Sequence, residues 1–450
     1  MRIYLISPTH RNRDGSLHKT TRYWTSGITL PYLKALTPPG HDVSMVDEMF
    51  YDVDLDGSYD LVGITAMGPQ IARAYELADH FRERGAKVVL GGTWVSLTAD
   101  ASLKHADAVV VGEAEHLWKD LLADMERGQS RGIYKAEKWH DLVGLPVIDH
   151  TKLPLLNYET FKKSWFYKMY FHWPVIFSRG CPHPCEYCAV QTYYSRSYRT
   201  RPVEEVIDEL KRIKSLGADR ILFLDDNPIA KPEAAKELFR QMIPLRVKWA
   251  SQSTINIARD AELLDLAARS GCVSLSIGLE SINPVSLEGV SKGFNLPGRF
   301  DQDLRAIREK GIQVIALLML GLDGDTVATF GHTLEFLIAN KVSFLKLFTP
   351  CPYPGTKYYD DMMRAGRILT DDWGRYDYGS TLIKPAQMTG EEMLDGFRRV
   401  YSGFYSVPSI AKRLFPPPAR SVLETLAYTF ANLKVNRYLS RSAEAWATIS

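Results

Sequence analysis

Three cysteines lie close together in the middle of the chain, at Cys181, Cys185 and Cys188. Thiolates at this spacing can each bind a different iron of a four-iron cubane, which leaves the fourth iron open to another ligand. A structural zinc site is a poorer interpretation, because such sites are closed by four ligands and the chain has no second C-x-x-C pair. His183 is a candidate for a fourth ligand, although it stands between two prolines. Three unrelated buried thiols are the remaining alternative.

The segments before this loop alternate between strand and helix patterns, with a helix expected at Gln70–Arg84. This alternation predicts an α/β protein that begins with a Rossmann-like open parallel sheet covered by helices on both faces. In such sheets, ligands bind beyond the carboxyl ends of the strands. The expected strands are Arg2–Ser7, Asp42–Val46, Leu61–Thr65, Lys87–Gly91 and Ala108–Val111.

A second alternating series predicts a partial (β/α)6 TIM-type barrel, with its active face at the carboxyl ends of the strands. The cysteine loop directly follows the first strand of this series. We expect a sheet domain over 1–130, an aromatic-rich linker over 131–169, the barrel over 170–380 and a C-terminal helical region over 381–450. The expected strands are Val175–Ser178, Arg220–Leu224, Val247–Ser251, Val273–Ile277, Val314–Leu320 and Ser343–Leu347, and the expected helices are Pro202–Ser215, Pro232–Met242, Ala261–Ser270, Leu304–Lys310 and Val327–Ile338.

Composition excludes several classes of protein. Lys and Arg number 55 against 53 Asp and Glu, so the net charge of +2 provides no basic field for nucleic acid. No apolar run approaches the roughly 20 residues of a membrane helix. Five cysteines in 450 residues are too few for a secreted disulfide framework. We therefore expect a soluble, cytoplasmic chain without a membrane span or a nucleic-acid partner.

The three cysteines, with Tyr187 before the last of them and a (β/α) series after them, resemble the radical S-adenosylmethionine enzymes. The open sheet that precedes them is similar to the cobalamin-binding subclass of that family. The resemblance implies a 4Fe-4S cluster held by the cysteines, whose open iron binds S-adenosylmethionine. It also implies cobalamin as a cofactor and an electron donor such as flavodoxin or ferredoxin. The protein would supply orientation, electrostatics and exclusion of water.

Three strand ends in the second series match segments with which this family holds S-adenosylmethionine. Polar groups after the second strand suit the ammonium group of the cofactor, although the two aspartates there could simply cap the next helix. The segment after the fourth strand has a structural alternative, a glycine turn with a solvated glutamate. The fifth strand ends where relatives have Gly-Leu-Pro-Gly-Glu-Thr, and here Asp323 and Asp325 replace the proline and the glutamate. The implied contacts are Tyr187, Asp225, Asp226, Asn227, Ser276, Gly278, Glu280 and Gly321.

Three loops at one edge of the first sheet resemble the cobalamin-binding loops of the subclass. Glycines there would let the backbone approach a bulky ligand. The motif D-x-H-x-x-G is absent, because Pro8 and Arg13 flank His10 at the Asp and Gly positions, so we expect cobalamin without a histidine ligand. Met67 could line the lower face of cobalt or pack in the core, and a structural domain without ligand is the alternative for the whole sheet. The implied contacts are Thr65, Met67, Gly91, Gly92, Thr93, Gly112 and Glu113.

Two further features have both a functional and a structural interpretation. Arg199 and Arg201 could counter the charge of the cluster or of a cofactor carboxylate, or pair with surface acids. Aromatic residues near the C-terminus could shape a pocket for a hydrophobic substrate or form a core interface. They are Phe404, Tyr405, Phe415, Tyr428 and Phe430.

The resemblance implies an enzyme, and methyl transfer is the commonest activity of the subclass. We expect a methyltransferase that acts on an unactivated carbon, or on phosphorus, of a small molecule through methylcobalamin and a 5'-deoxyadenosyl radical. An oxidative cyclase or ring-rearranging enzyme would use the same cofactors without methyl transfer. A non-catalytic cobalamin or redox sensor is the third possibility, for which no signalling module is visible. The sequence does not identify the substrate.

Overall fold

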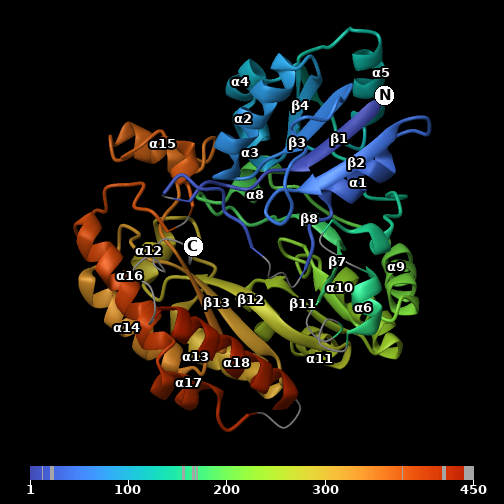
Figure 1. The fold of residues 1–450 in the computed structure, drawn as a ribbon. Helices are drawn as coiled ribbons and strands as arrows, with labels where there is room; N and C mark the ends of the chain where they lie inside the picture. Colours follow the sequence, from blue (N-terminus) through green and yellow to red (C-terminus); the bar gives the residue numbers. More distant parts are fainter. Residues whose placement is uncertain are drawn as a thin grey trace.

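The computed structural model describes residues 1–12, 14–20, 25–154, 158–164, 168, 171–377, 379–417 and 422–439. Its N-terminal part is a six-stranded sheet in the order β2-β1-β3-β4-β5-β6, in which all pairings are parallel (Figure 1). The prediction of this sheet is confirmed, and the three-residue strand β6 is an addition to it. The strands are β1 (Arg2–Ser7), β2 (Asp42–Asp47), β3 (Leu61–Thr65), β4 (Lys87–Gly91), β5 (Ala108–Val111) and β6 (Ile133–Lys135).

Helices cover both faces of this sheet because its central strands are apolar on both sides (Figure 1). On one face lie α2 (Gln70–Glu83), α3 (Thr93–Leu97) and α4 (Ala99–Ser102). On the other lie α1 (Thr29–Leu36) and α5 (Trp118–Glu126). The strand order reverses between β1 and β3, which is the point where open sheets of this kind bind ligands.

The second part is a six-stranded parallel sheet in the order β14-β13-β12-β11-β10-β7, which forms the predicted partial barrel with helices on its outer side (Figure 1). A short antiparallel pair, β8 (Ser178–Gly180) and β9 (Tyr198–Thr200), lies before the outer helix at Val203–Ser215. The strand predicted at Val175–Ser178 is wrong in its bounds, because the first barrel strand ends at Val175 and Ser178 begins β8. The barrel strands are β7 (Trp173–Val175), β10 (Arg220–Phe223), β11 (Lys248–Ser253), β12 (Cys272–Glu280), β13 (Gln313–Met319) and β14 (Phe344–Phe348). The helices among them are α8 (Ala189–Tyr193), α9 (Val203–Ser215), α10 (Pro232–Met242), α11 (Ala261–Arg269), α12 (Pro284–Glu288), α13 (Phe300–Glu309), α14 (Val327–Ala339) and α15 (Lys357–Arg364).

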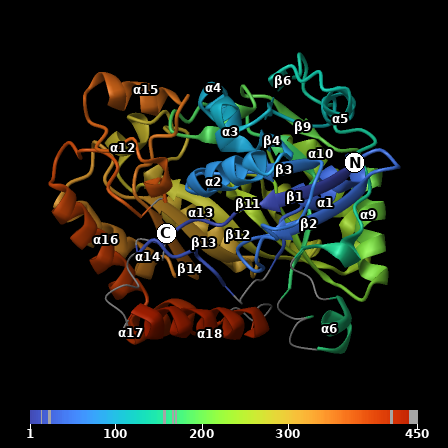
Figure 2. The ribbon, with the colours of Figure 1, turned by 45° about the horizontal axis from the view of Figure 1, so that its top comes forward.

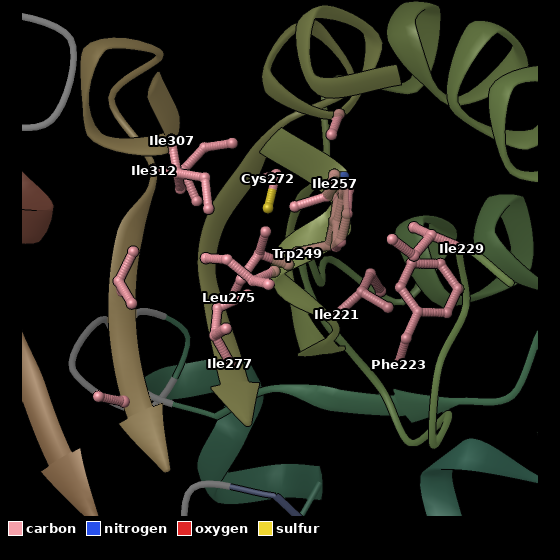
Figure 3. Close-up of a cluster of buried hydrophobic side chains, with 14 of the residues drawn as sticks. Ile221, Phe223, Ile229, Trp249, Ile257, Cys272, Leu275, Ile277, Ile307 and Ile312 are labelled. Atoms are coloured by element: carbon pink, nitrogen blue, oxygen red, sulfur yellow. The ribbon is translucent and has the colours of Figure 1, made fainter. Parts of the chain in front are cut away.

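Every second side chain of the barrel strands packs outward against these helices. Figure 3 shows this core, with Phe223, Trp249 and Leu275 from three neighbouring strands close together. The Trp249 ring stacks on Phe239 of α10 at a centroid distance of 4.9 Å. Cys272 belongs to the same cluster and is a packing residue of the core. The intervening side chains of each strand therefore face the inside of the barrel.

The C-terminal helices are α16 (Gly390–Phe404), α17 (Val407–Leu414) and α18 (Val422–Leu439). Helix α18 runs across the amino ends of the barrel strands (Figure 2). Its Glu424 binds Lys248 at 2.6 Å and Arg220 at 3.5 Å, and its Thr425 accepts a hydrogen bond from Gln313. The helix thus closes one end of the barrel.

The aromatic residues near the C-terminus mostly have structural positions. Phe404 and Tyr405 are buried in the barrel core, whereas Phe415 and Phe430 are exposed. Tyr428 packs edge-on against Phe344. The core interpretation is therefore supported for Phe404 and Tyr405.

The linker predicted over 131–169 is described only in part, because 155–157, 165–167 and 169 lie outside the described residues. A short helix, α6 (Tyr158–Lys163), lies within it. Phe161 of this helix packs edge-on against Trp173 of β7 inside the barrel core. This contact joins the end of the linker to the first barrel strand. No helix among the described residues is long and apolar enough to cross a membrane.

Candidate functional site

The three cysteines lie in the loop that joins β8 to α8, and Cys188 is the residue that caps the amino end of α8. Cys185 is buried, and Cys181 and Cys188 are half-buried. Burial raises the pKa of each thiol, that of Cys188 to about 12. The thiolates needed for iron binding therefore require the charge of bound metal to form. No group of three metal-binding side chains in the described part of the chain is arranged around a single ion.

A buried lysine that the sequence did not single out faces this loop. Lys292 Nζ lies 2.5 Å from Glu280 Oε1 and 3.1 Å from the Tyr187 hydroxyl. Although burial opposes the charge, Glu280 holds the pKa of Lys292 above its usual value. A side chain at position 278 would lie 2.5 Å from Glu280 Oε1, so Gly278 makes room for the pair. The interpretation of Glu280 as solvated is wrong, because the residue is only 8% exposed.

The polar residues after β10 turn toward the strand that leads into the cysteine loop. Asp225 accepts hydrogen bonds from the backbone and the hydroxyl of Ser178, and Asp226 accepts one from the Gly180 amide. Burial raises the pKa of Asp225 to about 7 and that of Asp226 to about 6. Neither aspartate caps the next helix, so that alternative is wrong. Asn227 Nδ2 lies 3.8 Å from Cys181 Sγ, and its Oδ1 is buried without a partner.

The glycine and the two aspartates that follow β13 have structural roles in the turn. Gly321 has a φ of +99°, and a Cβ there would lie 2.3 Å from Met393 Sδ. Asp325 accepts hydrogen bonds from the Gly321 amide and from Ser286, which holds the turn closed. Asp323 is paired with Arg367. The carboxylates of this segment are therefore occupied by the protein, and Ser276 on β12 remains half-buried on the inner face of the barrel.

A cavity of about 260 Å³ lies at the carboxyl ends of β3, β4 and β5. Its other wall comes from the barrel, through Ile176, Arg179, Tyr193 and Tyr194. The structure brings together around it all seven residues that the sequence suggested for cobalamin, which are Thr65, Met67, Gly91, Gly92, Thr93, Gly112 and Glu113.

Individual residues of the cavity have different parts in it. Met67 is 61% exposed, so the interpretation of it as a core residue is wrong. Gly92 has a φ of +102°, and a Cβ there would lie 2.6 Å from the Ala66 carbonyl oxygen, which explains the glycine by the fold itself. Gly91 has space beside it, because the nearest atom to its Cβ position is 3.9 Å away. The Tyr32 hydroxyl is buried at the cavity close to Glu115 and Arg179 but makes no hydrogen bond of normal geometry, so a bound polar group could satisfy it.

Ion pairs between the two parts of the chain form one wall of this cavity. Arg179 Nη1 on β8 binds Glu113 Oε1 at 2.9 Å and Glu115 Oε1 at 2.6 Å. Arg199 Nη1 on β9 binds Glu113 Oε2 at 2.7 Å. Burial opposes the charge of Glu113, but the two guanidinium groups hold its pKa below the usual value. Glu113 is therefore occupied by arginines rather than free for a ligand.

The arginines after the cysteine loop do not pair with surface acids. Arg199 binds the buried Glu113, as described above, and Arg201 binds Glu209 at 2.5 Å, with His150 Nε2 3.3 Å from the same carboxylate. The side chains of Arg201, Glu209 and His150 are all at most 10% exposed. The alternative that the two arginines pair with surface acids is therefore wrong, because Glu113 and Glu209 are buried.

The loop after β14 completes the contact between the two parts. Its Tyr353 packs against Trp94 of α3 at a centroid distance of 5.1 Å, and Cys351 is buried in the same cluster. Burial raises the pKa of the Cys351 thiol well above its usual value. This cysteine is consequently a packing residue with a protonated thiol.

Comparisons with known proteins agree with the geometry. Residues 175–337 match the profile of the "Radical SAM superfamily". The chain is 30% identical over 417 residues to a bacteriochlorophyllide d C-12(1)-methyltransferase of Chlorobaculum tepidum, which covers 91% of this chain and 88% of the relative. It is 25% identical over 403 residues to an anaerobic magnesium-protoporphyrin IX monomethyl ester cyclase of Cereibacter sphaeroides, covering 83% of this chain and 64% of that protein.

A solved structure shares the fold. The radical S-adenosylmethionine methyltransferase TsrM from Kitasatospora setae, solved with cobalamin and a [4Fe-4S] cluster bound, superposes with a TM-score of 0.65 at 19% identity. The superposition covers 81% of this chain and 78% of that one. The order of an open parallel sheet followed by a partial barrel is therefore common to both.

Proposed function

The chain belongs to the cobalamin-dependent radical S-adenosylmethionine enzymes, and from that premise we propose that it methylates an unactivated carbon of a small molecule. Methyl transfer is favoured because the relative that is 30% identical over nearly the whole chain is a methyltransferase. When bound, the cluster, S-adenosylmethionine and cobalamin supply radical formation and a carrier for the methyl group. The side chains described above would bind these groups and position them relative to the substrate.

One observation carries the proposal: a single short helix joins the two candidate sites. Cys188 caps the amino end of the five-residue helix α8, and Tyr193, its last residue, lines the cavity on the N-terminal sheet. A group held by the cysteine loop and a group held in the cavity would therefore be neighbours. Two cofactors that act on one substrate need this proximity.

The donor sets fit the groups that we assign to them. Three thiols in one partly buried loop suit a 4Fe-4S cluster with one open iron. The unpartnered Asn227 Oδ1 next to Cys181 is an acceptor for the ammonium group of S-adenosylmethionine. The buried Tyr32 hydroxyl and the free space at Gly91 suit cobalamin. The cavity of about 260 Å³ is smaller than the roughly 300–1,000 Å³ of typical ligand sites, so a macrocycle requires side chains at its rim to move.

The chain's own residues would hold these groups in register. Arg179 fixes the cysteine loop to the cavity wall through Glu113 and Glu115. The buried pair of Lys292 and Glu280 places a positive charge beside the cysteine loop, where a negatively charged cluster or a carboxylate would lie. Burial of Cys185 and Glu280 keeps water from this region.

Product stoichiometry tests the proposal. The anaerobically reconstituted protein would receive cobalamin, reductant and methyl-labelled S-adenosylmethionine, and 5'-deoxyadenosine and S-adenosylhomocysteine would be compared with bound cobalt and iron. We expect S-adenosylhomocysteine up to the amount of bound cobalamin even without substrate. Production of 5'-deoxyadenosine alone would contradict methyl transfer. A Cys272→Ser variant, altered at a core thiol away from the loop, is the matched control and should retain both products.

The second candidate is an oxidative cyclase, which the 25% identical magnesium-protoporphyrin relative favours. The same assay separates the two, because a cyclase would not form S-adenosylhomocysteine. We also propose that the protein acts in the cytoplasm and takes electrons from a flavodoxin or ferredoxin. This electron donor can be tested by adding it, in reduced form, to the reconstituted protein and following reduction of the cluster by the cluster's visible absorbance.

A further inference from the structure

The inner face of the barrel sheet, here called the lumen, is lined by alternate residues of the strands. Pairing in register places Leu222 beside Ala250, Gln252 beside Ser276, and Leu317 beside Lys346. These residues alternate with the outward core residues, such as Trp249, Ile277 and Leu345. Because side chains alternate along a strand, the lumen residues share one face.

Several side chains on the inner face of the barrel sheet are not fully covered by other described parts of the chain. Leu222, Ile315 and Leu317 remain half-buried, and Leu224 is 36% exposed, although all four belong to the barrel sheet or its immediate end. Helix α18 closes the end nearest Phe344, through the edge-on contact with Tyr428. The cysteine loop and Glu280 lie at the opposite end. The lumen therefore lies between a closed floor and the candidate cofactor site, and apolar and neutral polar side chains line it.

Lys346 is a cation on this inner face for which the described residues provide no counter-ion. Lys346 lies on β14, two residues beyond Phe344, and its side chain is exposed. Within the described part of the chain no hydrogen bond or ion pair reaches its Nζ. Its neighbours on the same face, Phe344, Phe348 and Leu317, are all apolar. Although the side chain is in contact with solvent, the surrounding barrel wall partly desolvates its charge and lowers the pKa of Lys346.

A cation on the inner face of the barrel that no protein acid neutralises is available to a ligand that supplies the opposite charge. We propose that Lys346 binds a carboxylate of the substrate and thereby sets which carbon faces the cofactor site. This inference rests on the proposed function, because it takes the lumen as the substrate site. Lys346 is in register with Leu317, which pairs with Gly278, so its Cα is about 10 Å along the sheet from Gly278. A carboxylate fits better than a phosphate, because one lysine balances one charge and phosphate sites commonly use arginine forks.

A binding measurement tests the proposal without relying on methyl transfer. The reconstituted protein would be titrated under anaerobic conditions with 4-(1-pyrenyl)butyrate and with 4-(1-pyrenyl)butanol, which differ in their charged group. Fluorescence gives both dissociation constants. We expect the wild-type protein to bind the carboxylate about tenfold more tightly than the alcohol, since a charge-assisted hydrogen bond is worth about one order of magnitude in affinity.

Variants assign the preference to one side chain. Lys346→Met should lose the tenfold preference and bind the alcohol at least as well as before, whereas Lys346→Arg should keep it. Lys211→Met, on the outer surface of α9 and paired with Asp208, is the matched control and should behave as wild type. Circular dichroism and iron content should be the same in all of these proteins.

Three results would overturn the proposal. The first is a wild-type protein without a preference for the carboxylate, including one that binds neither probe. The second is an equal decrease in the affinities for both probes in Lys346→Met. The third is a weaker affinity for S-adenosylmethionine in that variant, which would assign the lysine to the cofactor. Failure of methyl transfer would leave these binding results intact, so the two proposals fail separately.

Discussion

Removal of Arg179 should weaken the junction between the sheet and the barrel more than its single position suggests. Its guanidinium group binds Glu113 and Glu115, and the three side chains are at most 12% exposed. In Arg179→Met, Glu113 keeps Arg199, but Glu115 loses the only ion pair that the structure gives it. Breaking a buried pair costs about 3–5 kcal/mol because one charge stays buried and unpaired. Since Glu113 remains paired, we expect a loss near the low end, about 3 kcal/mol in the free energy of unfolding.

Chemical denaturation of the reconstituted protein would measure this loss, with bound cobalamin followed by its visible absorbance. The double variant Arg179→Met/Glu115→Gln should recover about half of it, because the uncompensated charge is gone. Lys211→Met removes an exposed pair and should change stability by less than about 0.5 kcal/mol. A loss below about 1 kcal/mol in Arg179→Met, or no recovery in the double variant, would refute the reasoning.

Three further predictions concern the cofactor sites and pH. Cys185→Ala should lose iron and all cleavage of S-adenosylmethionine, measured by iron analysis and chromatography; a variant that keeps both would contradict the cluster assignment. Gly91→Val should lower cobalamin content at constant iron content, whereas Gly92→Val should impair folding, because only Gly91 has space for a side chain. Glu113 has a lowered pKa in the folded state, so its stabilising effect is complete above its unfolded pKa of about 4.5 and disappears as pH falls through the lower folded value. The free energy of unfolding should therefore fall less steeply with decreasing pH in Glu113→Gln than in the wild-type protein. Identical slopes in the two proteins would contradict the assignment.

The sequence predicted both sheets because their strands are apolar and separated by helices of regular period. The strand bounds from Arg2–Ser7 to Ala108–Val111 agree to within one residue, whereas the three-residue β6 is too short for periodicity to detect. The cavity was also predictable in outline, because parallel strands place their following loops at one edge.

Contacts between distant parts of the chain could not be predicted. Arg179 and Glu113 are 66 residues apart, and nothing in their local sequence indicates that they pair. Lys292 follows a polar segment and reads as a surface lysine, yet it is buried against Glu280. Lys346 alternates with leucines, a pattern that predicts a strand with one solvated face. Only the barrel geometry turns that face toward a lumen.

The position of cobalt relative to iron tests the account most directly. Anomalous diffraction at the cobalt and iron absorption edges, from crystals of the reconstituted protein, locates both metals independently of any activity. The account predicts iron within the loop of Cys181, Cys185 and Cys188, and cobalt in the cavity bounded by Gly91, Gly112 and Tyr193. Cobalt at another surface of the protein, or a cavity that stays without cobalt in crystals that contain cobalamin, would contradict it.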